Sequence, residues 1–213
     1  ASQTMLDNAK GEFNLYSKSY IYPPSLANEY LTLIKNRKEP FSKQEMIIMY
    51  AGSLLKEKGI FNLIEAFIEA DMKYTELHLY GFDHKLIIDK YKNNKSIKFF
   101  GIVSSNILYH AYSQADIIVN PHLRVKNNKY IFPCKNIEII ASGALPLLSI
   151  YSFYGNTNFS IPEKCFYEKK RELIFLIKNA KSVWAKEYKE IKELSKCIRK
   201  NFSSKNIEKN ITE

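Results

Sequence analysis

Apolar runs and amphipathic segments alternate along the middle of the chain. The run MIIMYAG at 46–52 ends at a glycine and has the continuous hydrophobicity of a strand buried on both faces. The segment IFNLIEAFIEA at 60–70 has apolar residues three and four positions apart, which predicts an amphipathic helix. A buried strand, a loop and a helix therefore follow one another.

The same alternation continues to residue 149. Four further strands and three further helices are expected, the strands at 76–81, 96–101, 116–121 and 144–149 and the helices at 84–94, 105–115 and 134–142. Strands separated by helices are typical of a parallel sheet with right-handed crossovers. The predicted fold class is α/β, a Rossmann-like domain with a parallel sheet of about five to six strands flanked by helices.

The flanking segments are less regular. A short helix is predicted at 26–37, a short strand within 158–167, and helices from residue 170 to the C-terminal end. We therefore expect two parts, a connecting segment at 1–18 and one domain with a C-terminal helical tail at 19–213.

Composition and charge narrow the function classes. The chain has 46% hydrophobic residues, which is a globular composition, and its net charge of +10 favours anionic partners. Nucleic acid, an acidic membrane surface and a phosphorylated small ligand all fit that charge, and so does a lysine-rich solvated surface. The three cysteines are far apart without C-x-x-C spacing, which argues against disulfides or zinc and favours a reducing cytoplasm.

The first candidate site lies at the ends of the predicted strands. Three strands end at Gly52, Gly81 and Gly101 and a fourth at Pro121, and ligands of open α/β sheets lie beyond the carboxyl ends of the strands. Lys58 precedes a predicted helix N-terminus, and N–H groups there with a lysine nearby form an anion site. A tight turn with a solvated lysine is the alternative.

The segment YIFPCKNIEIIASGALPLLS contains a second candidate site. Pro133 and Gly143 suit the two ends of the helix at 134–142, and Lys135 and Glu138 share a face near its start. A charge in so apolar a run needs a partner or a ligand. A carboxylate there can accept hydrogen bonds from a ribose diol while the helix N–H groups hold a phosphate. A surface ion pair between the two side chains is the other interpretation.

Five blocks carry a family resemblance: YAGSLLKEKGIFNLIEAF, LHLYGFD, IKFFGIV, LYHAYSQADIIVNPH and FPCKNIEIIASGALPLLS. In order and spacing they resemble the C-terminal, donor-binding domain of GT-B glycosyltransferases, in particular retaining family 4 (glycosyl transferases group 1), over about 20–167. The resemblance implies one of two Rossmann-like domains that face each other across a cleft. The second of these domains binds the nucleotide sugar.

The resemblance also assigns residues. Lys58 corresponds to the lysine that contacts the donor diphosphate, and Glu138 to the second glutamate of the E-x7-E motif, which binds the ribose. Two positions differ from the family pattern: Ser53 replaces an arginine at the phosphate site, and Tyr130 stands in place of the first glutamate. No metal or other cofactor is implied. The donor-binding residues expected are Gly52, Ser53, Gly81, Gly101, Ile102, Val103, Lys135, Asn136 and Ile137.

The resemblance implies transfer of a hexose from a UDP- or GDP-sugar to a hydroxyl of a glycan or lipid-linked acceptor, with retention of configuration. We expect a cytoplasmic protein, peripheral on the acidic inner face of the plasma membrane, that does not bind nucleic acid. Because the 45 residues before the first strand are too few for an acceptor domain, we expect a truncated domain with little activity alone. A non-catalytic nucleotide-binding module and, less favoured, a basic nucleic-acid binder are the alternatives.

Four other side chains are candidates with simpler interpretations. His122, in the loop after a strand at the site edge, is a possible acid–base group, although a role without ligand contact is the favoured interpretation, and His110 on a helix is expected to be structural. Asp116 is expected to pair with backbone groups. Trp184 is expected to pack in the core, although a membrane-facing helix is the alternative.

Overall fold

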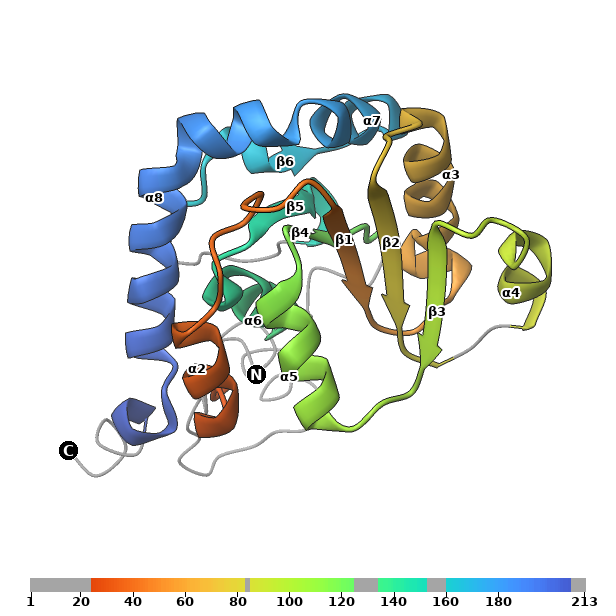
Figure 1. Ribbon diagram of the computed structural model, residues 1–213. Coiled ribbons are helices and arrows are strands. Elements are labelled where there is room, and N and C mark those ends of the chain that lie inside the picture. Colours follow the sequence, from red (N-terminus) through yellow and green to blue (C-terminus); the bar gives the residue numbers. More distant parts are fainter. Residues whose placement is uncertain (1–23, 83–84, 125–133, 153–159, 208–213) are drawn as a thin grey trace, which may run out of the picture.

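The computed structural model describes residues 24–82, 85–124, 134–152 and 160–207. Its centre is a six-stranded parallel sheet in the order β3-β2-β1-β4-β5-β6 (Figure 1), which confirms the predicted Rossmann-like α/β class. The strands are β1 (Met46–Ala51), β2 (Thr75–Tyr80), β3 (Ile97–Gly101), β4 (Ile117–Asn120), β5 (Leu145–Ser149) and β6 (Phe166–Tyr167).

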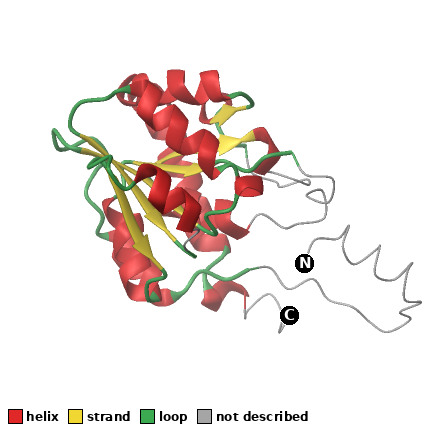
Figure 2. Cartoon of the chain, turned by 90° about the vertical axis from the view of Figure 1, so that its right-hand side faces the viewer, coloured by secondary structure: helices red, strands yellow, loops and turns green. Residues whose placement is uncertain are grey.

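Helices lie on both sides of this sheet (Figure 2). Helix α3 packs against α7, whereas α5 contacts α2 and α6, and α6 contacts α8. The α-helices are α2 (Asn28–Lys35), α3 (Ile60–Ala70), α4 (Lys85–Tyr91), α5 (Ser105–Gln114), α6 (Cys134–Ser142), α7 (Lys170–Lys178) and α8 (Ala180–Asn201). The short 3-10 helices within the described residues are η1 (Lys56–Lys58), η3 (Ile150–Ser152) and η4 (Glu163–Cys165).

The core follows from this layering. A central parallel strand is covered on both faces, so its residues are apolar without alternation, and all of β4 and β5 is buried. Edge strand β3 is only partly buried. The middle of the sheet is therefore apolar and buried, and polar functional groups are expected in the loops.

The strand order fixes where a ligand fits. From β1 the chain moves outward through β2 and β3, then crosses back so that β4 pairs with the other side of β1, with Ile48 opposite Ile117. The loops after β1 and β4 consequently lie side by side where the order reverses, which is where open α/β sheets bind ligands.

The C-terminal helices close the domain. Trp184 of α8 is 8% exposed, and its ring lies 6.0 Å from the ring of Phe41 and 5.4 Å from that of Tyr188, which confirms core packing. Leu26, before α2, donates its N–H to the carbonyl of Phe202 at 2.7 Å, so the two ends of the described chain are joined. Among the described helices, none is long and apolar enough to cross a membrane. The predicted boundary between residues 18 and 19 lies outside the described residues.

Candidate functional site

The loop after β1 leads directly to a helix N-terminus. Gly59 lies between η1 and α3, where the chain changes direction, and its φ of 76° is in the left-handed region. A Cβ on Gly59 would lie 1.7 Å from the carbonyl oxygen of Pro121, so only glycine allows this approach. The start of α3, with Lys58 beside it, is therefore held against the loop that follows β4.

Lys58 meets a histidine at this junction. Its Nζ lies 3.4 Å from Nε2 of His122, which is half-buried. The carbonyl of His122 accepts a hydrogen bond from Ser149 Oγ at 2.7 Å, which ties the loop to β5. Burial, and secondarily the charge of Lys58, lower the pKa of the His122 imidazole, so the ring is neutral at neutral pH.

A buried amide network positions the start of α6. Asn120 at the end of β4 donates from Nδ2 to Oδ1 of Asn136 at 2.6 Å, and Asn136 Nδ2 donates to the carbonyl of Ser152 at 2.8 Å. Asn136 is 0% exposed, so its side chain is structural, and its predicted phosphate contact involves only the backbone N–H. The network places the first turn of α6, with its N–H groups and positive dipole end, at the carboxyl end of β4.

Glu138, one turn further along α6, is held by three contacts. The buried Tyr112 hydroxyl lies 3.3 Å from Oε2, Lys135 Nζ lies 3.6 Å from the same oxygen, and the Tyr30 hydroxyl donates to the Glu138 carbonyl at 2.6 Å. Burial, and next the charge of Glu138, raise the pKa of Tyr112, which stays a neutral donor. The Glu138 side chain is 38% exposed, so it is not a buried charge. The ion pair with Lys135, which was the alternative interpretation, is present, and the carboxylate also remains accessible to a ligand.

The glycines at the ends of β1, β2 and β3 form a row. Gly81 donates its N–H to the carbonyl of Gly101 at 2.8 Å, and a Cβ on Gly81 would lie 1.9 Å from the carbonyl oxygen of Gly52. The backbones are therefore packed without side chains between them. Beyond this row, Ile102 is 76% exposed and Val103 is half-buried, and their contact with the base stays a prediction. Ser53 accepts a hydrogen bond at its carbonyl from Tyr50 at 2.9 Å.

The predicted site residues thus lie on the loops and the helix start at the carboxyl edge of the sheet. Tyr130, the departure from E-x7-E, lies outside the described residues. His110 is exposed on α5. Sequence reasoning named His122 without its partner and missed Tyr112. The Asn-Pro-His sequence after β4 indicated His122, whereas no local sequence feature indicated Tyr112. The described residues contain no group of three or more His, Cys, Asp or Glu side chains that could hold a metal ion.

The far end of α6 is anchored by two arginines. Arg37 donates to the carbonyl of Ser142 at 2.9 Å and to that of Ala115 at 2.6 Å. Arg199 of α8 donates to the carbonyl of Ala141 at 2.7 Å. Burial lowers the pKa of Arg37 to about 10, so the guanidinium remains charged and suits the negative end of the helix dipole.

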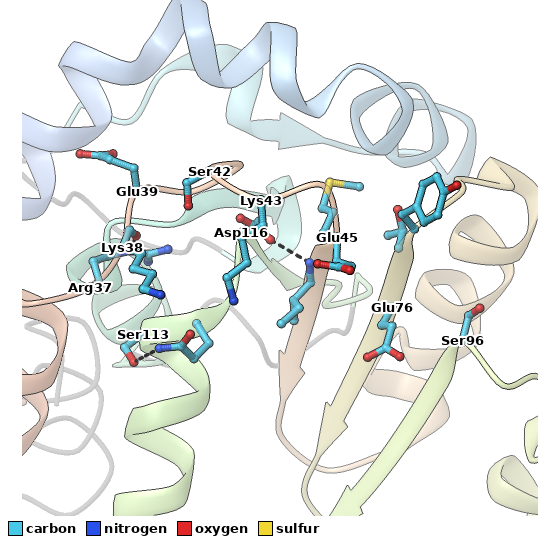
Figure 3. A pocket seen from close by; sticks show the side chains of 15 residues that line it. Arg37, Lys38, Glu39, Ser42, Lys43, Glu45, Glu76, Ser96, Ser113 and Asp116 are labelled. Atoms are coloured by element: carbon cyan, nitrogen blue, oxygen red, sulfur yellow. Dashed lines mark hydrogen bonds between the residues drawn. The ribbon is translucent and has the colours of Figure 1, made fainter.

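A pocket of about 440 Å³ lies at the opposite, amino edge of the sheet (Figure 3). Its lining includes Asp116, whose two oxygens accept the N–H groups of Phe41 at 2.5 Å and Ile47 at 2.8 Å, which confirms the predicted backbone role. Glu76, at the start of β2, pairs with His78 at 2.8 Å. Because the pocket is lined by residues where the strands begin, it is distinct from the site at the carboxyl edge.

Solved structures share this fold. Sucrose-phosphate synthase from Thermosynechococcus elongatus has a TM-score of 0.67 at 18% identity and is matched over 100% of this chain and 56% of its own. A glycosyltransferase from Rickettsia africae has a TM-score of 0.65 at 16% identity and is matched over 98% of this chain and 60% of its own. Anabaena HepE in complex with UDP and glucose has a TM-score of 0.56 at 12% identity and is matched over 100% of this chain and 52% of its own. The chain thus spans little more than half the length of these structures.

The sequence comparison gives the family. No curated protein sequence matches the chain significantly. The family described as Glycosyl transferases group 1 matches residues 33–159, more than half of the chain. That range contains β1 to β5 and every predicted site residue, from Gly52 to Glu138. The chain therefore belongs to the glycosyl transferases group 1 family.

Proposed function

We propose that this chain is the donor-binding part of a glycosyltransferase and binds a nucleoside diphosphate sugar, UDP- or GDP-linked, at the carboxyl edge of its sheet. In the reaction, the bond between the sugar C1 and the diphosphate oxygen breaks and the nucleoside diphosphate leaves. The acceptor hydroxyl forms the new bond to C1 and loses its proton. Family membership and the half-length match to glycosyltransferase structures support this assignment.

The observation that carries the proposal is the meeting of two cationic features at one edge. Lys58 and the start of α3 contact the loop after β4, and the last residue of β4 is bonded to the first turn of α6. A diphosphate between Lys58 and the α6 N–H groups would have its charge neutralised without a metal ion. Such neutralisation also stabilises the leaving group as the sugar bond breaks.

The remaining contacts follow from the same pose. Glu138 is the ribose ligand, because its accessible carboxylate is held by Tyr112 and lies one turn from the helix start. The base packs on the loop from Gly101 to Val103, with Gly81 alongside. We further propose a hexose donor, retention of configuration, and a glycan or lipid-linked acceptor, which a chain of net charge +10 can approach on an acidic membrane surface.

Calorimetric titration of the chain with UDP, GDP and ADP tests the proposal. We expect binding of at least one nucleotide, weakened about 10- to 100-fold by Lys58→Ala and by Glu138→Ala, because each removes a charge-assisted contact. Lys56→Ala is the matched control, since Lys56 is exposed on the same short helix as Lys58.

Two results would contradict the proposal. One is the absence of binding to all three nucleotides by the folded chain. The other is salt-sensitive binding to RNA or DNA with no nucleotide binding, which would assign the basic surface to a nucleic acid.

A further inference from the structure

We propose that His122 is a second cationic ligand of the donor diphosphate: its imidazole takes up a proton when the nucleotide sugar binds and then contacts the diphosphate beside Lys58. The inference rests on the proposed function, because it requires the diphosphate to bind at Lys58. It adds a proton-coupled step to that binding.

The geometry determines the protonation state before the ligand arrives. A lysine ammonium has three donors and no acceptor, so a hydrogen bond between Lys58 Nζ and His122 Nε2 at 3.4 Å needs a lone pair on Nε2. The proton of the neutral ring is then on Nδ1. A doubly protonated ring would place two positive charges at that distance. In the free protein His122 therefore accepts a hydrogen bond from Lys58.

The loop fixes the backbone that bears the imidazole. Pro121 lies against Gly59, which has no room for a side chain, and the His122 carbonyl is bonded to the buried Ser149 hydroxyl. Both backbone contacts flank the residue that bears the ring. A diphosphate that reaches Lys58 thus finds His122 at the same place.

The negative charge of a bound diphosphate favours the protonated His122 ring, whereas the free protein favours the neutral ring. In the free protein, burial and Lys58 lower the pKa of His122, and Lys58 is the charged group among the described residues whose field does so. Arg124 follows in the same loop and is exposed, while Lys135 and Glu138 of α6 pair with each other. A bound diphosphate carries about two negative charges and favours the imidazolium, so the pKa rises in the complex.

The sign of the pH dependence follows directly. Because the complex binds more protons than the free protein, binding tightens as pH falls from above the raised pKa to below the lowered one. Since the unperturbed histidine pKa is about 6.5, the change is expected between about pH 8 and pH 6. A histidine that only positions Lys58 would give no proton uptake.

The test is calorimetry of the full chain with UDP-glucose and with GDP-mannose, in buffers of different ionisation enthalpy. These diphosphates are esterified at both ends and do not titrate in this range, whereas the terminal phosphate of UDP does. We expect uptake of a fraction of a proton near neutral pH and an affinity that rises several-fold between about pH 8 and pH 6. In His122→Gln, which keeps a neutral side chain near Lys58, uptake should vanish and the pH profile should flatten.

His110→Gln is the matched control, because His110 is exposed on α5, and it should behave as the unmodified chain does. Binding without proton uptake, or uptake that persists in His122→Gln, would overturn the role of His122 and leave the proposed function intact. Failure of the folded, unmodified chain to bind either nucleotide sugar, and also UDP and GDP themselves, at any pH would instead overturn both. If His122→Gln does not fold, NMR titration of the histidine ring protons of the unmodified chain decides. One pKa must rise on ligand binding, and four unchanged values would refute the inference.

Discussion

At the scale of single residues, Tyr112 shows how a buried group prepares an exposed one. The ring is 1% exposed, and its hydroxyl reaches Oε2 of Glu138 at 3.3 Å. Lys135 contacts the same oxygen but is itself partly solvated, so it orients the carboxylate less firmly. Tyr112 is thus the more rigid support for the proposed ribose ligand, and it leaves Oε1 without a contact to either residue.

We therefore expect Tyr112→Phe to weaken nucleotide binding. Loss of one hydrogen bond to a carboxylate corresponds to about 1 kcal/mol, or roughly 5-fold in the dissociation constant. The measurement is calorimetric affinity for the nucleotide that binds best. Tyr109→Phe is the control, since Tyr109 contacts the Tyr30 ring at 5.0 Å and makes no hydrogen bond to Glu138. Equal affinities for the two variants would refute a positioning role for Tyr112.

The residues that could be predicted from sequence are those placed by local signals. Lys58 precedes a glycine and a helix, and Glu138 follows a helix start, so both could be assigned to the carboxyl edge from neighbours in sequence. His122 and Tyr112 meet their partners across 64 and 26 residues, respectively. Contacts of that separation depend on side-chain placement, which periodicity does not specify.

At the scale of elements, α6 is fixed at both ends, and this sets the direction of its N-terminus. At its start, Asn136 is bonded to Asn120 and to Ser152. At its end, Arg199 donates to the carbonyl of Ala141 and Arg37 to that of Ser142. The carbonyls of the last helical turn lack partners within the helix, so two guanidinium groups satisfy them and complement the dipole.

We expect Arg199→Met to lower the free energy of unfolding by about 1–3 kcal/mol, since it removes the charged donor of the buried Ala141 carbonyl at the end of α6. Urea denaturation followed by circular dichroism measures this change. Lys196→Met on the same helix is the control, because Lys196 is exposed and pairs with exposed Glu193. Losses of equal size in the two variants would contradict anchoring by Arg199. In combination with Arg37→Met the effects should not add, because both arginines contact the Ser142 carbonyl.

The elements themselves were largely predictable, and their ends were not. The alternation of apolar and amphipathic segments located every strand from β1 to β5, because buried parallel strands and amphipathic helices have different periods. The helix expected at 26–37 spans Asn28–Lys35, since Arg37 leaves the helix to bond the end of α6. The two arginine anchors were missed because each acts on a carbonyl far away in sequence.

At the scale of the whole molecule, the two edges of the sheet have different roles. Backbone hydrogen bonds to Asp116 and the Arg37 anchor stabilise the amino edge, where β1 and β4 begin. The carboxyl edge has closely packed glycines and the N-termini of α3 and α6, and its ion pair is solvated. The amino edge is thus occupied by structural hydrogen bonds, whereas Lys58 and the accessible carboxylate of Glu138 at the carboxyl edge are available to a ligand.

The cysteines offer a direct measure of that global stability. Cys134 and Cys197 are exposed, whereas Cys165 of η4, which packs against β5, is 0% exposed, and burial raises its pKa to about 12. Only the thiolate reacts with disulfide reagents. The thiols of Cys134 and Cys197 should therefore react at once in folded protein, and that of Cys165 should react only when the sheet opens. Its rate should rise with urea in step with global unfolding followed by circular dichroism. A third thiol whose rate did not depend on urea would instead show that η4 opens locally, without global unfolding of the sheet.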